Sequence, residues 1–409
     1  MDRPLEGIRI LEVAQFTFVP AAGAVLADWG ADIVKVEHAE TGDAQRGLVR
    51  VLGLAANKAG SSFAPIMEGP NRSKRSVGID LANPKARPIL EELVRRSDVF
   101  LTNYLPGPRA KLGLTLDDIR AINPNIIYVT GSGFGTEGPD ADKGAYDATA
   151  FWARGGSADG VMAPDAQRVS LMPSGAYGDN IGGMTIAGGI AAAIAGRERT
   201  GEPSVVDVSL LAVGAWAAQF SVNLALFTGG PLPKVLRTTA APGNPLSGAY
   251  RTADGRWLQF SMLQPTRYWN EFVAAIGRAD LVDDDRFTTM EAIFEHSVEI
   301  GGWFAEAIAT RAYAEWLEVF ENISGQWAPI QDSWEIGHDE ALIANGRIVE
   351  VIDADGRAQR LVASPVKFDD APVQMTRAPQ FAEHTDDILR EIGVDDEQLI
   401  ELKIAGAIT

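Results

Sequence analysis

The chain contains no cysteine and only four histidines among its 409 residues. The absence of cysteine excludes disulfide scaffolds, thiolate zinc sites, iron–sulfur clusters and a cysteine nucleophile, and it is usual in a reducing compartment. The histidines stand far apart, at positions 38, 296, 338 and 384. We therefore expect no metal site, and general base chemistry would have to rest on a carboxylate.

Positive charge is scarce as well, with 36 Lys and Arg against 55 Asp and Glu and a net charge of −19. Such a chain would repel nucleic acid and anionic membrane surfaces, so we expect neither as a partner. The uncharged stretch 209–233 carries several polar residues and no basic anchors, which favours a buried helix over a membrane span. The first residues show no basic cluster followed by an apolar run, so we expect no secretory signal and a cytoplasmic location.

Several well-known catalytic and nucleotide-binding motifs are missing. No serine occurs in G-x-S-x-G, no glycine precedes a lysine as in a phosphate-binding loop, and H-E-x-x-H is absent. The turn after the first predicted strand lacks G-x-G-x-x-G, and the later run 131–135 is followed by Thr136 where a third glycine would be needed. These absences argue against hydrolases of these kinds, P-loop NTPases and nicotinamide binding.

What the chain does contain is an alternation of short β-branched runs with helical patterns over its first 135 residues. Strands are predicted at 8–14, 32–37, 98–104 and 126–131. Repeated strand–helix–strand units form a parallel sheet through right-handed crossovers, and ligands bind at the carboxyl ends of its strands. Further along, a hairpin turning at Asp254 and Gly255, followed by amphipathic segments, predicts a smaller α+β domain.

A single carboxylate stands out in the segment PSGAYGDNIGG. Asp179 lies there between glycines, at the start of a helix made of small residues. It could cap the helix, since aspartate accepts hydrogen bonds from free helix amides. It could also be a reactive carboxylate, because flanking glycines would let a substrate approach closely. The residues alone leave both interpretations open.

Blocks of sequence along nearly the whole chain resemble the family III CoA-transferases, which include formyl-CoA transferase, carnitine CoA-transferase and the α-methylacyl-CoA racemases. In the family's order, the blocks are LEGIRILEVAQF, ADWGADIVKVE, NRSKRSVGIDL, TNYLPGPRAKLGLT, NPNIIYVTGSGFGTEGP, GAYD, RERTGEPSVVDVSLL, TADGRWLQFSM and APQFAEHTDDILREIG. The resemblance implies an α/β fold with a large Rossmann-like parallel-sheet domain built from both chain ends, a small α+β domain, and an interlocked homodimer.

The same resemblance implies a domain order. The N-terminal part of the large CoA-binding domain would span 1–205, a helical linker 206–240 and the small domain 241–325. The return linker and the C-terminal part of the large domain would occupy 326–409.

The resemblance also implies a reaction. The family's catalytic aspartate aligns with Asp179, which would attack an acyl-CoA thioester and form an acyl-aspartyl anhydride. The released thiolate would then give an aspartyl-CoA thioester, which an acceptor carboxylic acid resolves. Acyl-CoA and a carboxylic acid are thus the expected substrates. Coenzyme A would be a substrate rather than a permanently bound cofactor, and these steps need no metal.

The alignment with this family also suggests which residues contact CoA. They are Thr17, His38, Lys74, Arg75, Ile79, Asn103, Tyr104, Lys111 and Leu210. Lys111 stands where transferases often have arginine, which keeps the charge but loses the bidentate geometry. His38 and Leu105 also replace family arginines, and Thr17 replaces a glutamine of the formyl enzyme, so acyl specificity is expected to differ. Arg109 is interpreted as a solvated helix charge, which is also the alternative for Lys74 and Arg75.

One position separates the transferases from the racemases. The racemases carry histidine in G-H-D, whereas this chain has Tyr146 before Asp147. An unperturbed tyrosine titrates near 10, so a two-base proton exchange with Asp179 would lack its second base. Tyr146 and Asp147 are then expected to support Asp179, either by positioning the thioester or by polarising the Asp179 carboxylate. The alternatives are a racemase that uses Asp179 as its base and a non-catalytic CoA-binding relative.

Overall fold

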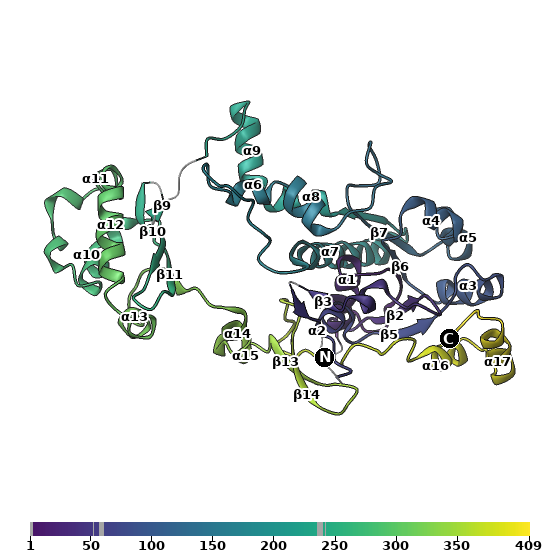
Figure 1. The fold of residues 1–409 in the computed structure, drawn as a ribbon. Coiled ribbons are helices and arrows are strands. Elements are labelled where there is room, and N and C mark those ends of the chain that lie inside the picture. Colours follow the sequence, from purple (N-terminus) through teal and green to yellow (C-terminus); the bar gives the residue numbers. More distant parts are fainter. Residues whose placement is uncertain (1–2, 52, 57–60, 235–239, 242) are drawn as a thin grey trace. The chain divides into compact units, whose positions relative to one another are not determined.

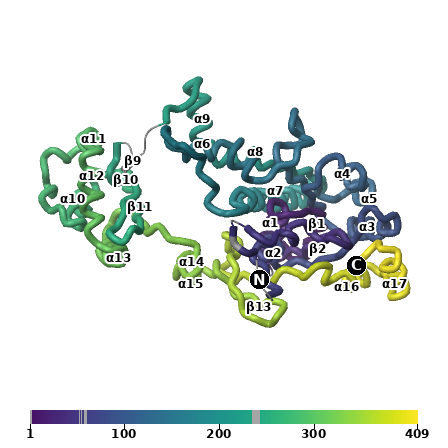
Figure 2. The backbone as a smooth tube through the Cα atoms, in the orientation of Figure 1, coloured from purple at the N-terminus to yellow at the C-terminus, as the bar shows by residue number. Residues whose placement is uncertain are grey.

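The computed structural model describes residues 3–51, 53–56, 61–234, 240–241 and 243–409. The chain divides into two units (Figure 1). The large unit comprises the segments up to residue 161, 169–230 and 340–409, and the small unit comprises 162–168 and 231–339. Segments from both ends of the chain therefore build the large unit, and the C-terminal segment runs beside the N-terminal strands (Figure 2).

A six-stranded sheet forms the centre of the large unit. Its strands are β1 (Arg9–Val13), β2 (Asp32–Glu37), β5 (Arg75–Gly78), β6 (Val99–Thr102), β7 (Ile127–Ser132) and β8 (Val205–Ser209). They pair in the order β5-β2-β1-β6-β7-β8, and every pairing is parallel. Because the order reverses between β1 and β6, this sheet is doubly wound, as the predicted Rossmann-like topology requires.

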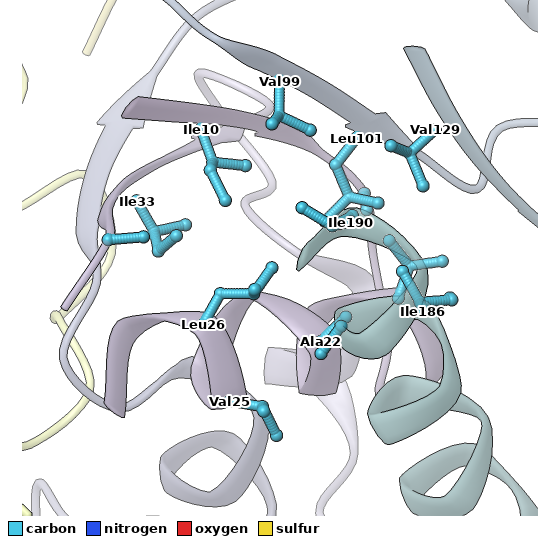
Figure 3. Packing of buried hydrophobic residues seen from close by; sticks show 14 of the residues in the cluster. Ile10, Ala22, Val25, Leu26, Ile33, Val99, Leu101, Val129, Ile186 and Ile190 are labelled. Atoms are coloured by element: carbon cyan, nitrogen blue, oxygen red, sulfur yellow. The ribbon is translucent and has the colours of Figure 1, made fainter. Parts of the chain in front are cut away.

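Apolar side chains point to both faces of this sheet, as expected for a parallel sheet covered on each side. One face packs against α1 (Phe18–Asp28), α7 (Tyr177–Thr200) and α8 (Leu210–Ala217). Figure 3 shows Ile10 and Val99 of the strands facing Leu26 of α1 and Ile190 of α7. The other face packs against α3 (Arg87–Arg95), α5 (Leu116–Ile122), α16 (Thr385–Glu391) and α17 (Asp396–Ile404).

The small residues of α7 allow it to pack closely against α1. A Cβ atom added to Gly183 would lie 2.6 Å from the Cβ of Ala21, and one added to Gly182 would lie 2.4 Å from the Phe18 ring. These distances are too short for any side chain larger than hydrogen. The glycines therefore serve helix packing, and this packing fixes the start of α7, which carries Asp179, against the first strand–helix turn.

Shorter elements complete the large unit. They are η1 (Ala44–Gly47), β3 (Arg50–Val51), β4 (Leu54–Ala55), α2 (Pro65–Asn71), η2 (Pro84–Ala86), α4 (Pro106–Lys111), the π-helix η3 (Ala148–Arg154), α6 (Ser157–Val161), α9 (Gln219–Thr228), α15 (Glu340–Ala344), β13 (Ile348–Ile352) and β14 (Ala358–Val362). No single helix in the described ranges has the length and apolarity to cross a membrane. Only α8 and α9 taken together do, and they are bent by 75°.

The small unit contains an antiparallel sheet covered by helices. Its strands are β9 (Ala240–Ala241), β10 (Asn244–Arg251), β11 (Trp257–Ser261) and β12 (Trp327–Pro329), paired in the order β12-β11-β10-β9. Its helices are α10 (Pro265–Ala275), η4 (Ala279–Leu281), η5 (Asp285–Phe287), α11 (Met290–Glu295), α12 (Ser297–Ile308), α13 (Tyr313–Phe320) and α14 (Ser333–Ile336). Phe260, Phe272, Phe304 and Trp316 lie in its core. The predicted hairpin is β10–β11, with Gly255 at φ +85° in the turn.

The units differ in extent from the domains expected from the sequence. The small unit continues on both sides of the expected 241–325 segment. The expected linker 206–240 begins inside β8, a strand of the central sheet, and continues through α8 and α9 of the large unit. Its residues 235–239 lie outside the described part of the chain.

Candidate active site

A cavity of about 640 Å³ opens at the carboxyl ends of β1, β6 and β7. Gln15 and Asn103, which follow β1 and β6, both line it, so the cavity lies where the strand order reverses. Open parallel sheets bind ligands at this position because the loops leave the sheet in opposite directions there. The loop after β7 and the first turns of α7 and α8 supply further lining, including Asp179 and Leu210.

Hydrogen bonds join the two loops across this point. The Gln15 backbone N–H donates to Asn103 Oδ1 at 3.1 Å, and Asn103 Nδ2 donates to the Gln15 carbonyl at 2.7 Å. Gln15 Nε2 also donates to the Tyr104 hydroxyl at 3.1 Å. Asn103 and Tyr104 therefore hold the floor of the cavity together, whatever else they bind.

Asp179 lies in the first turn of α7 and is only 9% exposed. Burial, and to a smaller extent the charge of Asp147, together raise the pKa of its carboxyl group to about 7. Within the described residues, no hydrogen bond or ion pair to this carboxylate is found. The cap position of α7 is Ala176, at φ +57° and without a side-chain cap. The interpretation of Asp179 as the N-cap is therefore wrong.

Asp147, and not Asp179, accepts a hydrogen bond from the start of α7. Its Oδ2 accepts the backbone N–H of Gly178 at 3.2 Å, and its side chain is 6% exposed. A Cβ added to Gly178 would lie 2.6 Å from the Phe151 ring, so a side chain there would push α7 away from η3. The Gly178 amide at the helix start therefore stabilises the negative charge of Asp147, whereas Asp179 has only the like charge of Asp147 near it among the described residues.

Tyr146 contributes an aromatic wall to the cavity. The residue is 61% exposed, and its ring meets the Phe16 ring edge to face, with ring centroids 5.5 Å apart. Its backbone N–H and carbonyl both bond to the Thr149 hydroxyl, which fixes the turn before η3. The cavity thus brings together Asn103, Tyr104, Leu210, Tyr146 and Asp179 of the predicted residues, with Asp147 in contact with Gly178.

Four other predicted residues lie near this edge of the sheet but do not line the cavity. Thr17 stands between the lining residues Phe16 and Phe18, and its hydroxyl donates to Gln45 Oε1 at 3.0 Å. His38 follows β2 and is exposed, with its Nδ1 accepting the Glu40 N–H. Ile79 follows β5 and is buried in the core. Lys111 is exposed at the end of α4.

Lys74 and Arg75 are placed differently from the expectation. Lys74 is fully buried, and its Nζ lies 2.6 Å from Glu12 Oε2 and 2.8 Å from the Pro20 carbonyl. Burial lowers the pKa of Lys74 to about 8, against the opposing effect of Glu12. Arg75 begins β5 at the opposite edge of the sheet and pairs with Asp32 and Glu391. The structure supports neither a solvated Lys74 nor a CoA contact by either residue.

The sequence reasoning missed several lining residues. Gln15, Phe16 and Phe18 were missed, although they directly follow β1, where a parallel sheet places its ligands. Arg109 also lines the cavity, half-buried in α4, so its interpretation as a solvated helix charge is corrected. The sequence did carry a signal for this position. Arg109 lies in a short helix that begins at a proline just after β6, and loops at the carboxyl end of a strand line ligand sites. Within the described ranges, no three His, Asp or Glu side chains are grouped so as to hold a metal ion.

Comparison with known proteins decides the family. The model of CoA-transferase family III matches residues 5–385. The chain belongs to CoA-transferase family III. It is 33% identical over 422 residues to formyl-CoA:oxalate CoA-transferase of Streptomyces avermitilis, with 100% of both chains covered. It is 28% identical over 401 residues to (R)-2-hydroxy-4-methylpentanoate CoA-transferase of Clostridioides difficile, with 98% of each covered.

A solved CaiB/BaiF family protein from Brucella suis shares the fold. It superposes with a TM-score of 0.82 at 25% identity, covering 96% of this chain and 100% of that one. The predicted family is therefore confirmed, and this CoA-transferase family III chain is an enzyme.

Proposed function

We propose that this enzyme moves CoA from an acyl-CoA thioester to a carboxylic acid through covalent intermediates on Asp179. The observation that carries the proposal is the buried Asp179 carboxylate, which lines the cavity at the sheet's switch point without a cationic partner among the described residues. A carboxylate with little solvation and no ion pair keeps its lone pairs free for attack. Its pKa of about 7 leaves a large ionised fraction near neutral pH.

The steps balance without an added proton donor. The Asp179 carboxylate attacks the thioester carbonyl, the carbon–sulfur bond breaks, and CoA leaves as thiolate with an acyl-aspartyl anhydride behind it. The thiolate attacks the aspartyl carbonyl and frees the donor acid. The acceptor carboxylate then attacks the aspartyl-CoA thioester to form a second anhydride. Thiolate attack on its acyl carbonyl gives the new acyl-CoA and restores Asp179.

Supporting roles follow from the contacts at the site. Asp147 holds the start of α7 through the Gly178 amide and raises the pKa of Asp179 by its charge. Tyr146 lies in the cavity wall, where it can position the acyl group. Because position 146 is tyrosine rather than histidine, the transferase is favoured over a racemase that would use Asp179 as its base.

CoA would approach the cavity along the loops that follow β2, β5 and β6. Asn103, Tyr104 and Leu210 line the cavity directly, and half-buried Arg109 brings positive charge to it. Lys111 is exposed on the same short helix as Arg109 and would meet a phosphate nearer the solvent. His38 and Ile79 directly follow β2 and β5, at the same edge of the sheet. Coenzyme A acts here as a substrate, with no permanent cofactor proposed.

The enzyme is also proposed to work as an interlocked homodimer in the cytoplasm. The support for a dimer is the apolar surface of α8 and α9, where Trp216, Phe220, Leu226 and Phe227 are exposed. Monomeric proteins rarely leave so many large apolar side chains together in water. The support for a cytoplasmic location is the absence of cysteine.

The experiment is a CoA-exchange assay in D2O with a panel of acyl-CoAs and free carboxylic acids, read by mass spectrometry of the CoA products. We expect a new acyl-CoA from at least one pair, no deuterium at the α-carbon, and no exchange with Asp179→Asn. Deuterium at the α-carbon without CoA transfer would identify a racemase. Tight CoA binding without either reaction would identify a non-catalytic relative.

A further inference from the structure

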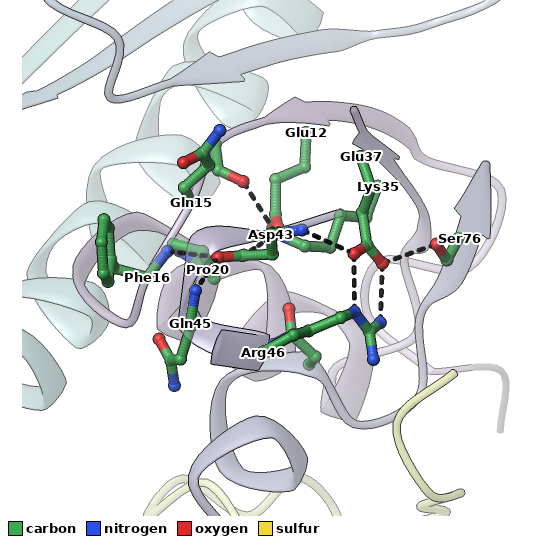
Figure 4. Close-up of polar contacts among 12 residues, drawn as sticks. Glu12, Gln15, Phe16, Pro20, Lys35, Glu37, Asp43, Gln45, Arg46 and Ser76 are labelled. Atoms are coloured by element: carbon green, nitrogen blue, oxygen red, sulfur yellow. Dashed lines mark hydrogen bonds and ion pairs between the residues drawn. The ribbon is translucent and has the colours of Figure 1, made fainter. Parts of the chain in front are cut away.

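The turn between β1 and α1 has an unusual backbone. Phe16 has φ +63°, in the left-handed region that residues with a Cβ seldom adopt. Its backbone N–H donates to Asp43 Oδ1 at 3.1 Å, and the next residue, Thr17, donates its hydroxyl to Gln45 Oε1. The turn after β1 is therefore docked on the turn after β2, as Figure 4 shows.

Buried charges hold Asp43 in place. Its Oδ2 lies 2.9 Å from Lys35 Nζ, and its Oδ1 also accepts the Gln45 N–H at 2.9 Å. Lys35 is fully buried, and its Nζ also lies 3.2 Å from Glu12 Oε1. Burial alone would lower the pKa of Lys35, but the surrounding carboxylates raise it above its usual value. Lys35 therefore stays charged, and Asp43 remains an acceptor fixed toward the Phe16 amide.

The Phe16 side chain faces the substrate side of this turn. Its ring contacts the Tyr146 ring edge to face at 86°, and both rings line the cavity that Asp179 also lines. Phe18 and Leu210 add apolar surface to the same cavity. In the proposed transfer, a thioester whose carbonyl reaches Asp179 places its acyl substituent in the cavity that Phe16 and Tyr146 also line. Aromatic walls of this kind favour large apolar substituents over small polar ones.

We propose that Phe16 is a specificity-determining wall of the acyl site and that Asp43 is its positioning residue. The preferred acyl groups then carry an aromatic or branched apolar substituent. This inference rests on the proposed CoA-transferase function and extends it to the substrate class. The role of Asp43 is indirect, since it acts through the backbone of Phe16.

The first test compares Phe16→Ala with Phe368→Ala. Phe368 also forms an edge-to-face pair, with Trp29, but it does not line the cavity, so it is a matched control. The readout is the ratio of kcat/KM for 3-phenylpropanoyl-CoA to that for acetyl-CoA. We expect Phe16→Ala to lower this ratio about tenfold through lost aromatic contact, and the control to leave it unchanged. A ratio that stays constant or rises in Phe16→Ala would overturn the assignment.

The second test measures the coupling between Asp43 and Phe16. Glycine adopts positive φ without strain, so Phe16→Gly no longer needs the hydrogen bond to Asp43. An asparagine at position 43 must turn its NH2 group toward either the Lys35 ammonium or the Phe16 amide, since the two carboxylate oxygens face these two donors. We therefore expect Asp43→Asn to lower the same ratio in the wild type but to change it less than twofold in the Phe16→Gly background. Additive effects would contradict the positioning role. If Asp43→Asn does not fold, Asp43→Glu keeps the charge while displacing the acceptor, and the same non-additivity is required.

A binding measurement separates this inference from the proposed function. Calorimetric titration of 3-phenylpropanoyl-CoA and acetyl-CoA measures a dissociation constant for each compound without turnover. The ratio of these two constants reports the same preference. If the wild type transfers no CoA but Phe16→Ala still weakens the binding of 3-phenylpropanoyl-CoA alone, the transferase proposal fails and the role of Phe16 as a specificity-determining wall is retained. If transfer occurs and neither ratio changes, the wall fails and the transferase remains.

Discussion

Two buried aspartates in the large unit have opposite surroundings. Asp43 is 2% exposed, lies 2.9 Å from Lys35 and accepts two backbone N–H groups. Asp179 is 9% exposed, and burial together with the charge of Asp147 raises its pKa to about 7. Both are removed from water, so burial alone does not distinguish a reactive carboxylate from a structural one. The presence or absence of a cationic partner does distinguish them. An unpaired carboxylate keeps its lone pairs available for reaction, and no ion pair offsets the free energy lost when it is removed from water.

The largest expected effect separates the two residues by activity. Asp179→Asn removes the attacking oxygen, so we expect kcat to fall by at least about 10³-fold. The affinity for CoA should stay within about threefold, since the cavity keeps its shape. Steady-state CoA exchange and equilibrium CoA binding measure both quantities. Exchange at a tenth or more of the wild-type rate would remove Asp179 from the covalent chemistry.

The second contrast concerns stability at pH 8, measured by urea unfolding. Asp43→Asn leaves the Lys35 ammonium without its closest carboxylate, so we expect it to cost about 3–5 kcal/mol of unfolding free energy. Asp179→Asn should instead stabilise the enzyme by about 1–4 kcal/mol. The pKa of Asp179 is raised in the folded state, so stability is lost as pH rises from about 4 to 7.

The gain from Asp179→Asn should therefore shrink at pH 5, where the native carboxyl group is still protonated. A stabilisation that is equal at pH 5 and pH 8 would contradict the raised pKa. So would equal destabilisation by Asp43→Asn and Asp179→Asn at pH 8, because that would mean that both carboxylates are paired.

The third prediction uses the charge of Asp147. If ionised Asp179 attacks the thioester, kcat/KM should rise with pH through about 7. Asp147→Asn removes the like charge but retains an acceptor for the Gly178 amide, so this rise should move to lower pH by roughly half a unit to one unit. Burial, the larger cause of the shift, remains in the variant. A pH profile that does not move would show that Asp147 acts only through structure.

The smallest effect concerns the cation that lines the cavity. Arg109→Leu should raise KM for acyl-CoA about five- to tenfold and leave kcat within twofold, because the charge serves binding rather than chemistry. Arg95→Leu, an exposed change on α3, is the matched control and should alter neither value. An effect of Arg109→Leu on kcat alone would show that it acts on the reacting groups.

Much of the fold and part of the site could be predicted from the sequence. The runs rich in β-branched residues predicted β1, β2, β6 and β7, because such residues favour strands and because both faces of a parallel sheet are largely apolar. β8 falls largely within the segment expected as a linker, and its partner β7 lies more than 70 residues earlier, so no local pattern shows this pairing. The flanking glycines and the family resemblance both singled out Asp179, which lines the cavity, although the capping interpretation remained open until the backbone was known.

Other features depend on contacts that no local pattern carries. The family resemblance suggested that Lys74 contacts CoA, and the alternative was a solvated charge, yet its ammonium group pairs with Glu12, 62 positions earlier, inside the core. The place of Phe16 after β1 was a signal for a lining residue, but the direction of its side chain could not be predicted, because it depends on a positive φ and on Asp43, 27 positions later. Such roles arise from tertiary pairing rather than from residue type.

The central claim is that Asp179 is the unpaired, covalently reacting carboxylate, and mass spectrometry tests it most directly. The enzyme is mixed with a panel of acyl-CoAs, with and without hydroxylamine, and the intact protein and its peptides are weighed beside Asp179→Asn. We predict an adduct of acyl or CoA mass on the peptide that contains Asp179, sensitive to hydroxylamine and absent from the variant. An adduct that persists in Asp179→Asn, or none at all while CoA exchange proceeds, would contradict the account.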